Sequence, residues 1–176
     1  IGGEVRVQAS EKISIIEGAS ISASSYTAGN RYKAGSAGQI FVQTKDLAID
    51  GLGDDDTGIR SFTASVGNAG NITIQASGEV QIANAGNITT ATNFLGAGGD
   101  IKLSAKNLIL DGKGNGRTGI FSNVGTQGSG NAGTLQITVA ENLLLKNSAK
   151  VSSSTDSYRE GSANAVDVSA RNILVR

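Results

Sequence analysis

The stretch AGNITIQASGEVQIANAGNITTAT at residues 69–92 decides the fold. It contains three short runs of apolar or β-branched residues, beginning at Ile72, Val80 and Ile88, with small and polar residues between them. Alternation with a period of two, rich in β-branched residues and bounded by Gly, Asn and Ser, is typical of strands and not of a helix. The stretch therefore predicts three short β-strands joined by tight turns.

The same pattern fills the whole chain. A small pair and a polar residue precede an apolar-x-apolar triplet six times, with the triplets beginning at Val5, Ile40, Ile72, Ile101, Leu135 and Val166. A second triplet follows in every unit, and a third triplet completes the first five units. The spacing from second to third triplet alternates between 8 and 12 residues. The true repeat is therefore a pair of units, which indicates duplication of a two-unit ancestor.

Repeats of this length predict a solenoid, because one unit of three short strands cannot bury its apolar side chains alone. Stacked coils would pair equivalent strands in parallel and place like residues on like. We expect an all-β, right-handed parallel β-helix of about three strands per coil and five to six coils, the hand following from the chirality of parallel crossovers. One inward stack is expected to contain Val7, Val42, Ile74, Leu103, Ile137 and Val168. A meander of hairpins or a β-sandwich is the rival fold, but most connections lack the Asn-Gly or Asp-Gly of two-residue hairpins.

The expected organisation is a single β-helix segment over residues 1–176, with repeats at 1–36, 37–68, 69–97, 98–131, 132–163 and 164–176. The chain begins at Ile1 without an initiator Met and stops partway through a coil. We therefore expect a fragment of a longer chain, with open edges on its terminal coils. Turns that need a residue tolerant of positive φ, or able to bond its own backbone, are expected just before the second triplets, at Asp46, Asn107, Asn142 and Asn172.

The composition excludes several classes of function. The 176 residues include no Cys and no His, so a thiolate nucleophile, a disulfide, a Cys/His zinc site and a Ser-His-Asp triad are all excluded. Lys plus Arg and Asp plus Glu both number 15, and aromatic residues make up 4%. No nucleic-acid partner is expected, because the chain lacks a basic stripe and stacking platforms. The longest apolar run, residues 143–145, is far too short for a transmembrane segment.

Three stretches carry a family resemblance: AGNITIQA at 69–76, LILDG at 108–112 and GNAG at 130–133. They resemble the repeats of filamentous-haemagglutinin-type exoproteins, adhesins that Gram-negative bacteria export by two-partner secretion. The resemblance extends over all six units, although the amino-terminal secretion domain of that family is not evident here. It implies a secreted filament at the bacterial cell surface that mediates adhesion to a cell-surface or extracellular-matrix ligand, with carbohydrate as one candidate.

Two other functions stay open: a β-helical carbohydrate-active enzyme, and a passive stalk that carries a separate effector domain. Parallel β-helices also host polysaccharide lyases and hydrolases, which use clustered carboxylates with Lys or Arg on the outside of the coil. Here the carboxylates cluster only in the insert 50–56, and no Lys or Arg is expected to stack with them on a strand face. We therefore expect no enzyme, no catalytic residue and no cofactor.

The same insert offers hard oxygen ligands for calcium, at Asp50, Asp54, Asp55 and Asp56. Its homologue at 111–118 lacks the acidic cluster, which favours a solvated turn and no metal site. Asn71 and Asn87 fit the glycosylation triplet but lead into expected strands, so we interpret both as turn residues.

Binding is expected on the outside of the coil. The outward positions of the second triplets end in three large aliphatic residues, Ile109, Leu144 and Leu174, which would form one exposed column. Such a column suggests a covered surface, packed against a long third-to-first connection of this chain, a partner, or another copy that associates laterally. The three residues are the candidate partner contacts. The connections 23–39 and 153–165 add rings that could stack on sugars or apolar groups, from Tyr26, Tyr32 and Tyr158.

Overall fold

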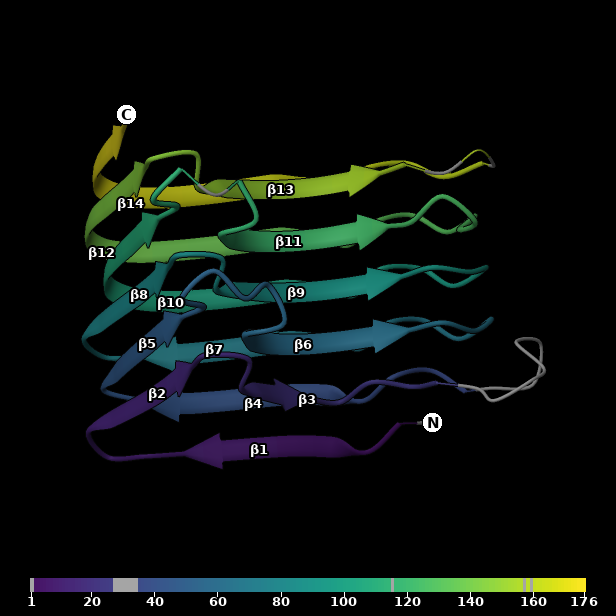
Figure 1. The fold of residues 1–176 in the computed structure, drawn as a ribbon, viewed down its shortest axis with the longest axis horizontal. Helices are drawn as coiled ribbons and strands as arrows, with labels where there is room; N and C mark the ends of the chain where they lie inside the picture. The colour runs from purple at the N-terminus through teal and green to yellow at the C-terminus, as the bar shows by residue number, and fades with distance from the viewer. Residues whose placement is uncertain (1, 27–34, 115, 157, 159) are drawn as a thin grey trace.

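The computed structural model describes residues 2–26, 35–114, 116–156, 158 and 160–176 of the chain. These residues form fourteen β-strands and no helix, and thus contain no helix able to cross a membrane. Every strand pairing among them is parallel and joins equivalent strands of successive repeats. The chain is a parallel β-helix of about five turns, as the repeat predicts (Figure 1).

The strands form a nine-stranded and a five-stranded sheet. In the first three coils the larger sheet contains separate strands, β1 (Glu4–Gln8), β2 (Lys12–Ile16), β4 (Gln39–Thr44), β5 (Asp46–Asp50), β7 (Ile72–Ala76) and β8 (Glu79–Ala83). In the later coils one strand continues around the corner, as β10 (Ile101–Asp111), β12 (Leu135–Lys146) and β14 (Val166–Val175). The smaller sheet contains β3 (Ser20–Ser22), β6 (Gly58–Thr63), β9 (Asn87–Thr92), β11 (Gly119–Val124) and β13 (Lys150–Thr155).

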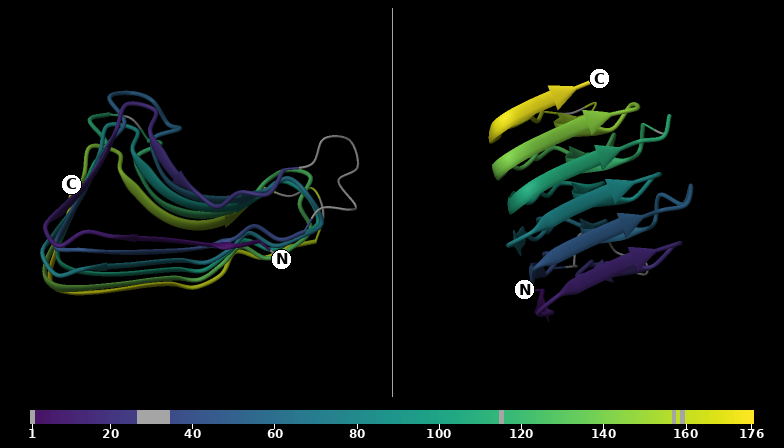
Figure 2. Two further views of the ribbon diagram at one scale, coloured as in Figure 1. Left: turned by 90° about the horizontal axis from the view of Figure 1, so that it is seen from below. Right: turned by 90° about the vertical axis from the view of Figure 1, so that its left-hand side faces the viewer.

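The prediction of separate first and second strands is therefore wrong for the last three coils. The corner survives there as an irregularity within a continuous strand, because the register of β10 with β12 shifts between Ala105 and Asn107. Seen along the axis from the N-terminal end, the chain turns clockwise as it recedes, which is the right-handed sense (Figure 2). The third strands bow toward the axis, so the outer face of the five-stranded sheet is concave (Figure 2).

The interior consists of stacked aliphatic side chains. The expected inward stack is confirmed, since strand pairing places its members in register from coil to coil: Val7 with Val42, Val42 with Ile74, Ile74 with Leu103, Leu103 with Ile137, and Ile137 with Val168. The middle coils are sealed, and Ile72, Val80 and Ile88 are 0% exposed. Beyond the last coil the stack is open, because β14 pairs only with β12 and leaves Ile173 and Val175 more than half exposed.

The small pair before each first strand has a steric cause. A Cβ on Gly70 would lie 1.9 Å from the carbonyl oxygen of Gly38, and one on Gly99 would lie 2.2 Å from that of Gly70. Buried hydroxyls of the third strands close this seam. Ser61 Oγ donates to the Gly38 oxygen at 3.0 Å and accepts from the Gly70 N–H at 2.8 Å. Glycine is needed here because successive coils approach each other through bare backbone.

The turns at residues 16–19, 83–86 and 146–149 link second to third strands in the coils with the shorter spacing. Each has two consecutive residues at positive φ, for example Asn84 at 52° and Ala85 at 74°. A hydrogen bond from the Gly86 N–H to the Ala83 oxygen, 2.8 Å long, closes that turn. These are the geometries of two-residue turns in which both central residues are left-handed.

The residues before the second triplets act differently from the prediction. None of them has a positive φ. Instead, their side chains bond along the coil axis: Asn142 Nδ2 donates to Asn107 Oδ1 at 2.9 Å, and Asn172 Nδ2 donates to Asn142 Oδ1 at 3.0 Å. In the earlier coils Asp46 Oδ1 accepts from the Glu79 N–H at 2.8 Å. The corner thus carries a ladder of amides that holds adjacent coils in register.

In the second and fourth coils, the longer connection between the second and third strands forms an insert. Each insert lies over the short turn of the preceding coil. Thr57 Oγ1 accepts from the Gly18 N–H at 2.6 Å, and Thr118 Oγ1 accepts from the Ala85 N–H at 2.7 Å. Both threonines are fully buried. The alternation of 8 and 12 residues therefore reflects a pairing of one short turn with one long insert.

Asp111 links the fourth and fifth coils at the end of their second strands. Its carboxylate accepts from Asn147 Nδ2 at 2.8 Å and from the Lys113 N–H at 3.1 Å, and it pairs with Lys146 Nζ at 3.0 Å. The hydrogen bond from Asn147 is the largest cause that lowers the pKa of Asp111 below its usual value, with Lys146 and Lys113 adding to it and desolvation opposing it. The native fold therefore favours the ionised carboxylate.

Candidate functional site

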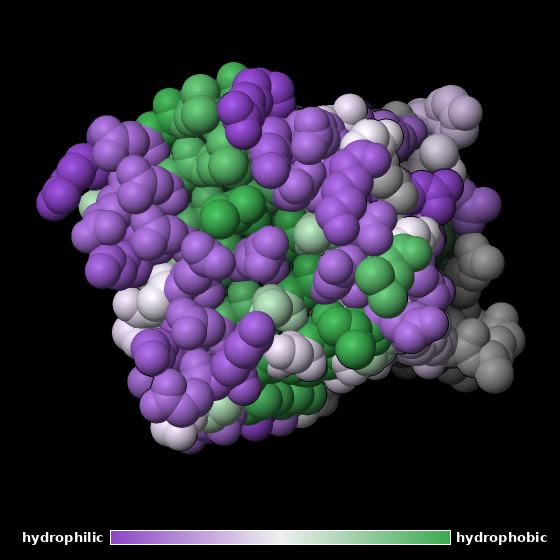
Figure 3. Space-filling model, turned by 60° about the vertical axis from the view of Figure 1, so that its left-hand side comes forward, coloured by the Kyte–Doolittle hydropathy of each residue, from purple (hydrophilic) through white to green (hydrophobic). Residues whose placement is uncertain are grey.

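The structure places the three predicted contact residues in one column. Ile109 pairs with Leu144, and Leu144 pairs with Leu174. Ile109 and Leu144 are half-buried, whereas Leu174 is 53% exposed. On this side of the molecule a hydrophobic band runs along the coil axis between hydrophilic flanks (Figure 3). We use "aliphatic column" for these three residues.

The described parts of the third-to-first connections do not cover the aliphatic column. They lie at the opposite end of the coil from the second strands (Figure 2). The expectation that these connections fold over the column is therefore wrong for the described residues. The cause is geometric, because the third strands carry the chain away from the corner that the second strands form.

The rings in those connections are exposed. Tyr26 is 70% exposed, and its ring centroid lies 5.4 Å from that of Phe62 on the outer face of β6. Tyr158 is 91% exposed. Tyr32 lies outside the described residues.

The acidic insert directs its carboxylates at its own backbone and at arginines. Asp50 Oδ1 accepts from the Leu52 N–H at 3.0 Å, and Asp54 Oδ1 accepts from the Asp56 N–H at 2.9 Å. Asp56 also forms an ion pair with Arg60, and Asp55 forms one with Arg117. Among the described residues no group of three or more Asp or Glu is placed to hold a metal ion. The arrangement is that of a hydrogen-bonded turn.

The sequence reasoning missed the two arginines that pair with this cluster. Arg60 lies on β6, four residues after Asp56, and the insert of the fourth coil brings Arg117 to Asp55 from 62 positions away. The two matched inserts lie two coils apart and meet across the short turn of the third coil. Their correspondence in the sequence indicates that the two inserts are equivalent, but it does not show that Arg117 and Asp55 meet.

These ion pairs border a hollow of about 320 Å³ on the concave face of the five-stranded sheet. Its lining includes side chains of β6, β9 and β11 together with the two inserts, namely Asp55, Arg60, Asn87, Thr89, Gly116, Arg117, Phe121 and Asn123. Asn87 forms part of the floor, since its side chain is buried and Nδ2 donates to the Asp55 carbonyl at 2.7 Å. This burial makes Asn87 a structural residue at the start of β9. Asn71 is exposed, and its Oδ1 accepts from the Asp100 N–H at 2.9 Å.

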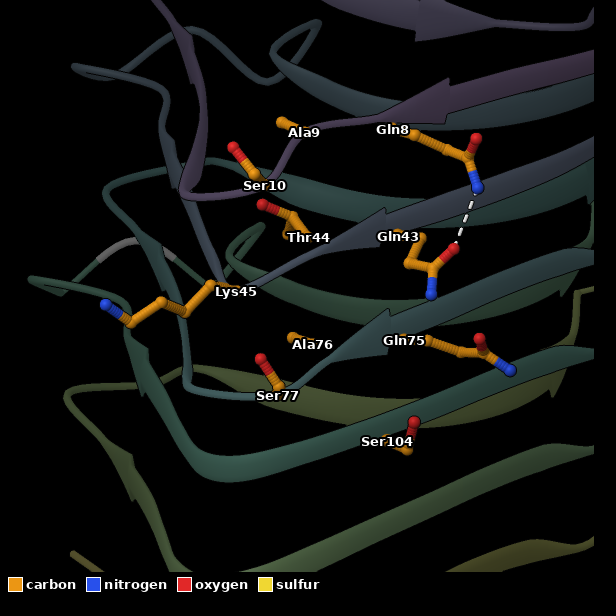
Figure 4. Close-up of a pocket in the computed structure, with 10 residues that line it drawn as sticks. All are labelled: Gln8, Ala9, Ser10, Gln43, Thr44, Lys45, Gln75, Ala76, Ser77 and Ser104. Atoms are coloured by element: carbon orange, nitrogen blue, oxygen red, sulfur yellow. Dashed lines mark hydrogen bonds between the residues drawn. The ribbon is translucent and has the colours of Figure 1, made fainter.

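A second hollow, of about 630 Å³, runs across the first strands near the corner. Figure 4 shows Gln8, Gln43 and Gln75 in a column on successive strands, with Ser104 next in line. Gln8 Nε2 donates to Gln43 Oε1 at 2.8 Å. The lining is mixed polar and apolar and includes neither an aromatic ring nor a carboxylate. The amide–amide bond between Gln8 and Gln43 runs along the axis, as those of the corner asparagines do.

Comparison of the chain with protein-family models, with curated proteins and with solved structures finds no match. Its function is therefore argued from the fold and from the surfaces described above.

Proposed function

We propose that the chain is a structural and adhesive segment of an extracellular filamentous surface protein, of the filamentous-haemagglutinin type. The observation that carries the proposal is the contrast between the inside and the outside of the coil. Inward positions repeat the same aliphatic residues, while outward positions on equivalent strands differ from coil to coil, as at Arg6, Phe41, Thr73, Lys102, Gln136 and Asp167. A rigid stack of this kind presents varied side chains at a fixed axial spacing of about 4.8 Å.

The fold suits a load-bearing filament. Stability in a solenoid is shared between neighbouring coils, so the structure lengthens by addition of coils without a new core. The aliphatic column and the concave face offer two outward surfaces for a partner, and the repeat motifs at 69–76 and 130–133 support an exported adhesin. Attachment to a cell surface or to extracellular matrix is the function that these features favour.

The test is adhesion by the purified chain. Fluorescent beads coated with the folded chain should bind epithelial monolayers or matrix-coated wells saturably, and soluble chain should compete. Beads coated with heat-unfolded chain are the control. An antibody against the chain should also label intact cells of the source bacterium without permeabilisation. Beads that bind no better than the unfolded control, together with labelling only after permeabilisation, would contradict the proposal.

A further inference from the structure

A slot on the concave face results from a short residue between two long ones. Arg60, Thr89 and Phe121 occupy equivalent outward positions on β6, β9 and β11, since Arg60 pairs with Thr89 and Thr89 pairs with Phe121. The backbones that carry Arg60 and Phe121 are two strand spacings apart, about 10 Å. Thr89 fills only the bottom of that gap. The result is a hollow lined by Phe121 on one side, Arg60 on the other and Thr89 between them.

The rim of the slot carries charges that cancel. Asp55 and Asp56 contribute two negative charges, and their partners Arg117 and Arg60 contribute two positive charges. The Arg60 side chain is 29% exposed, whereas that of its partner Asp56 is 74% exposed, so this ion pair is open to solvent on the carboxylate side. Asn123 adds an amide beside Phe121, and its Oδ1 is held by the Ser154 hydroxyl at 2.9 Å. The slot therefore offers many hydrogen-bond donors and acceptors, and its two ion pairs contribute no net charge, while the Lys150 ammonium lies beside Gly116 at its edge.

We propose that this slot binds one ring of a neutral saccharide, and that the biological role of the site rests on the proposed adhesive function. A sugar ring has apolar C–H faces that pack on an aromatic ring, and its hydroxyls donate to carboxylates and accept from guanidinium groups. An anionic saccharide or a phosphate would approach two carboxylates whose arginines are already paired. The volume of about 320 Å³ lies at the small end of ligand cavities. It suits a single ring, with the rest of the saccharide lying along the open concave face.

The experiment uses the purified chain and titration calorimetry with five probes. Three are neutral: cellohexaose, maltohexaose and chitohexaose. A hyaluronan hexasaccharide tests an anionic saccharide, and adenosine tests a flat aromatic ligand stacked between Phe121 and Arg60. Two variants alter the slot: Phe121→Ala removes one wall, and Thr89→Tyr fills the space between the walls while Arg60 and Phe121 themselves stay unchanged. Phe41→Ala is the matched control, because Phe41 is an outward, half-buried ring on β4 in the other sheet, under the Arg6 guanidinium.

We expect at least one neutral probe to bind with a millimolar or tighter Kd. Phe121→Ala should weaken that binding roughly tenfold or more, Thr89→Tyr should abolish it, and Phe41→Ala should leave it unchanged. The proposal is overturned if no neutral probe binds at millimolar concentration, if hyaluronan or adenosine binds in their place, or if the two slot variants bind like the parent chain. Saccharide binding without adhesion of coated beads would refute the adhesive function alone, whereas adhesion that survives both slot variants without saccharide binding would refute the site alone.

Discussion

A methyl group added at Gly99 tests whether coil stacking demands bare backbone at the start of each first strand. The Cβ of Gly99→Ala would lie 2.2 Å from the Gly70 carbonyl oxygen, about 1.2 Å inside ordinary contact at 3.4 Å. The obstacle is backbone, so the strand must shift. Overpacking of this kind costs about 1–3 kcal/mol, and the lower entropy of the unfolded alanine chain offsets about 0.4–1 kcal/mol. We expect a net loss of about 1.3 kcal/mol in the free energy of unfolding, or roughly 3–5 °C in Tm.

Gly3 supplies the matched control, because it occupies the equivalent position in the first coil and a Cβ there would meet nothing within 4 Å. Gly3→Ala should therefore leave stability unchanged or raise it slightly. Thermal and urea unfolding, followed by circular dichroism, measure both variants, and the slope of the urea transition should stay constant. Equal effects of the two substitutions would refute the steric explanation, and so would a Gly99→Ala chain as stable as the parent.

Three further predictions use the same unfolding assays. Leu108→Ala, at a fully buried position, should lower the free energy of unfolding by about 3 kcal/mol. Leu144→Asp on the outside should lower it by less than about 1 kcal/mol. A similar loss for both would mean that the chain itself covers the aliphatic column. Because its pKa is lowered in the fold, the ionised Asp111 carboxylate should stabilise the native state above its unfolded pKa of about 4, a contribution lost as pH falls through the lower folded value. Asp111→Asn should lack this loss of stability at acid pH, and an acid unfolding curve that the substitution leaves unchanged would contradict the assignment. Asn142→Leu removes both side-chain amide hydrogen bonds of that residue and should lower the free energy of unfolding by about 1 kcal/mol. A variant more stable than the parent chain would show that the asparagine ladder contributes nothing to stability.

The sequence predicts the strand stacks well because two periods constrain them together. The alternation within each triplet decides which side chains point inward, and the repeat length decides which triplets lie one above another. Val42 can pair with Ile74 in only one register that satisfies both periods, and the structure shows that register. Single corners are harder to predict. Whether a strand breaks at Lys45 or continues through Lys106 depends on backbone angles that small and polar residues tolerate equally well.

The candidate surfaces likewise include one that the sequence predicts and one that it does not. The column of Ile109, Leu144 and Leu174 follows from strand register alone, so it could be read from the triplets. The slot could not, because it depends on two loops that meet across a coil. Arg117 lies 62 residues from Asp55, and the matched inserts show in the sequence that the two loops are equivalent but not which of their side chains meet.

The two-unit period explains why such a slot exists. Inserts on every coil would stack about 4.8 Å apart, which leaves no room for side chains between them. Inserts on alternate coils stand two spacings apart, about 10 Å, which is the distance between packed layers. The insert of the second coil can therefore reach that of the fourth through Asp55 and Arg117, and the coil between them contributes the buried Asn87 and the short side chain of Thr89 to the slot. Duplication of a short-turn and long-insert pair thus creates, by geometry alone, both the rim and the floor of the slot.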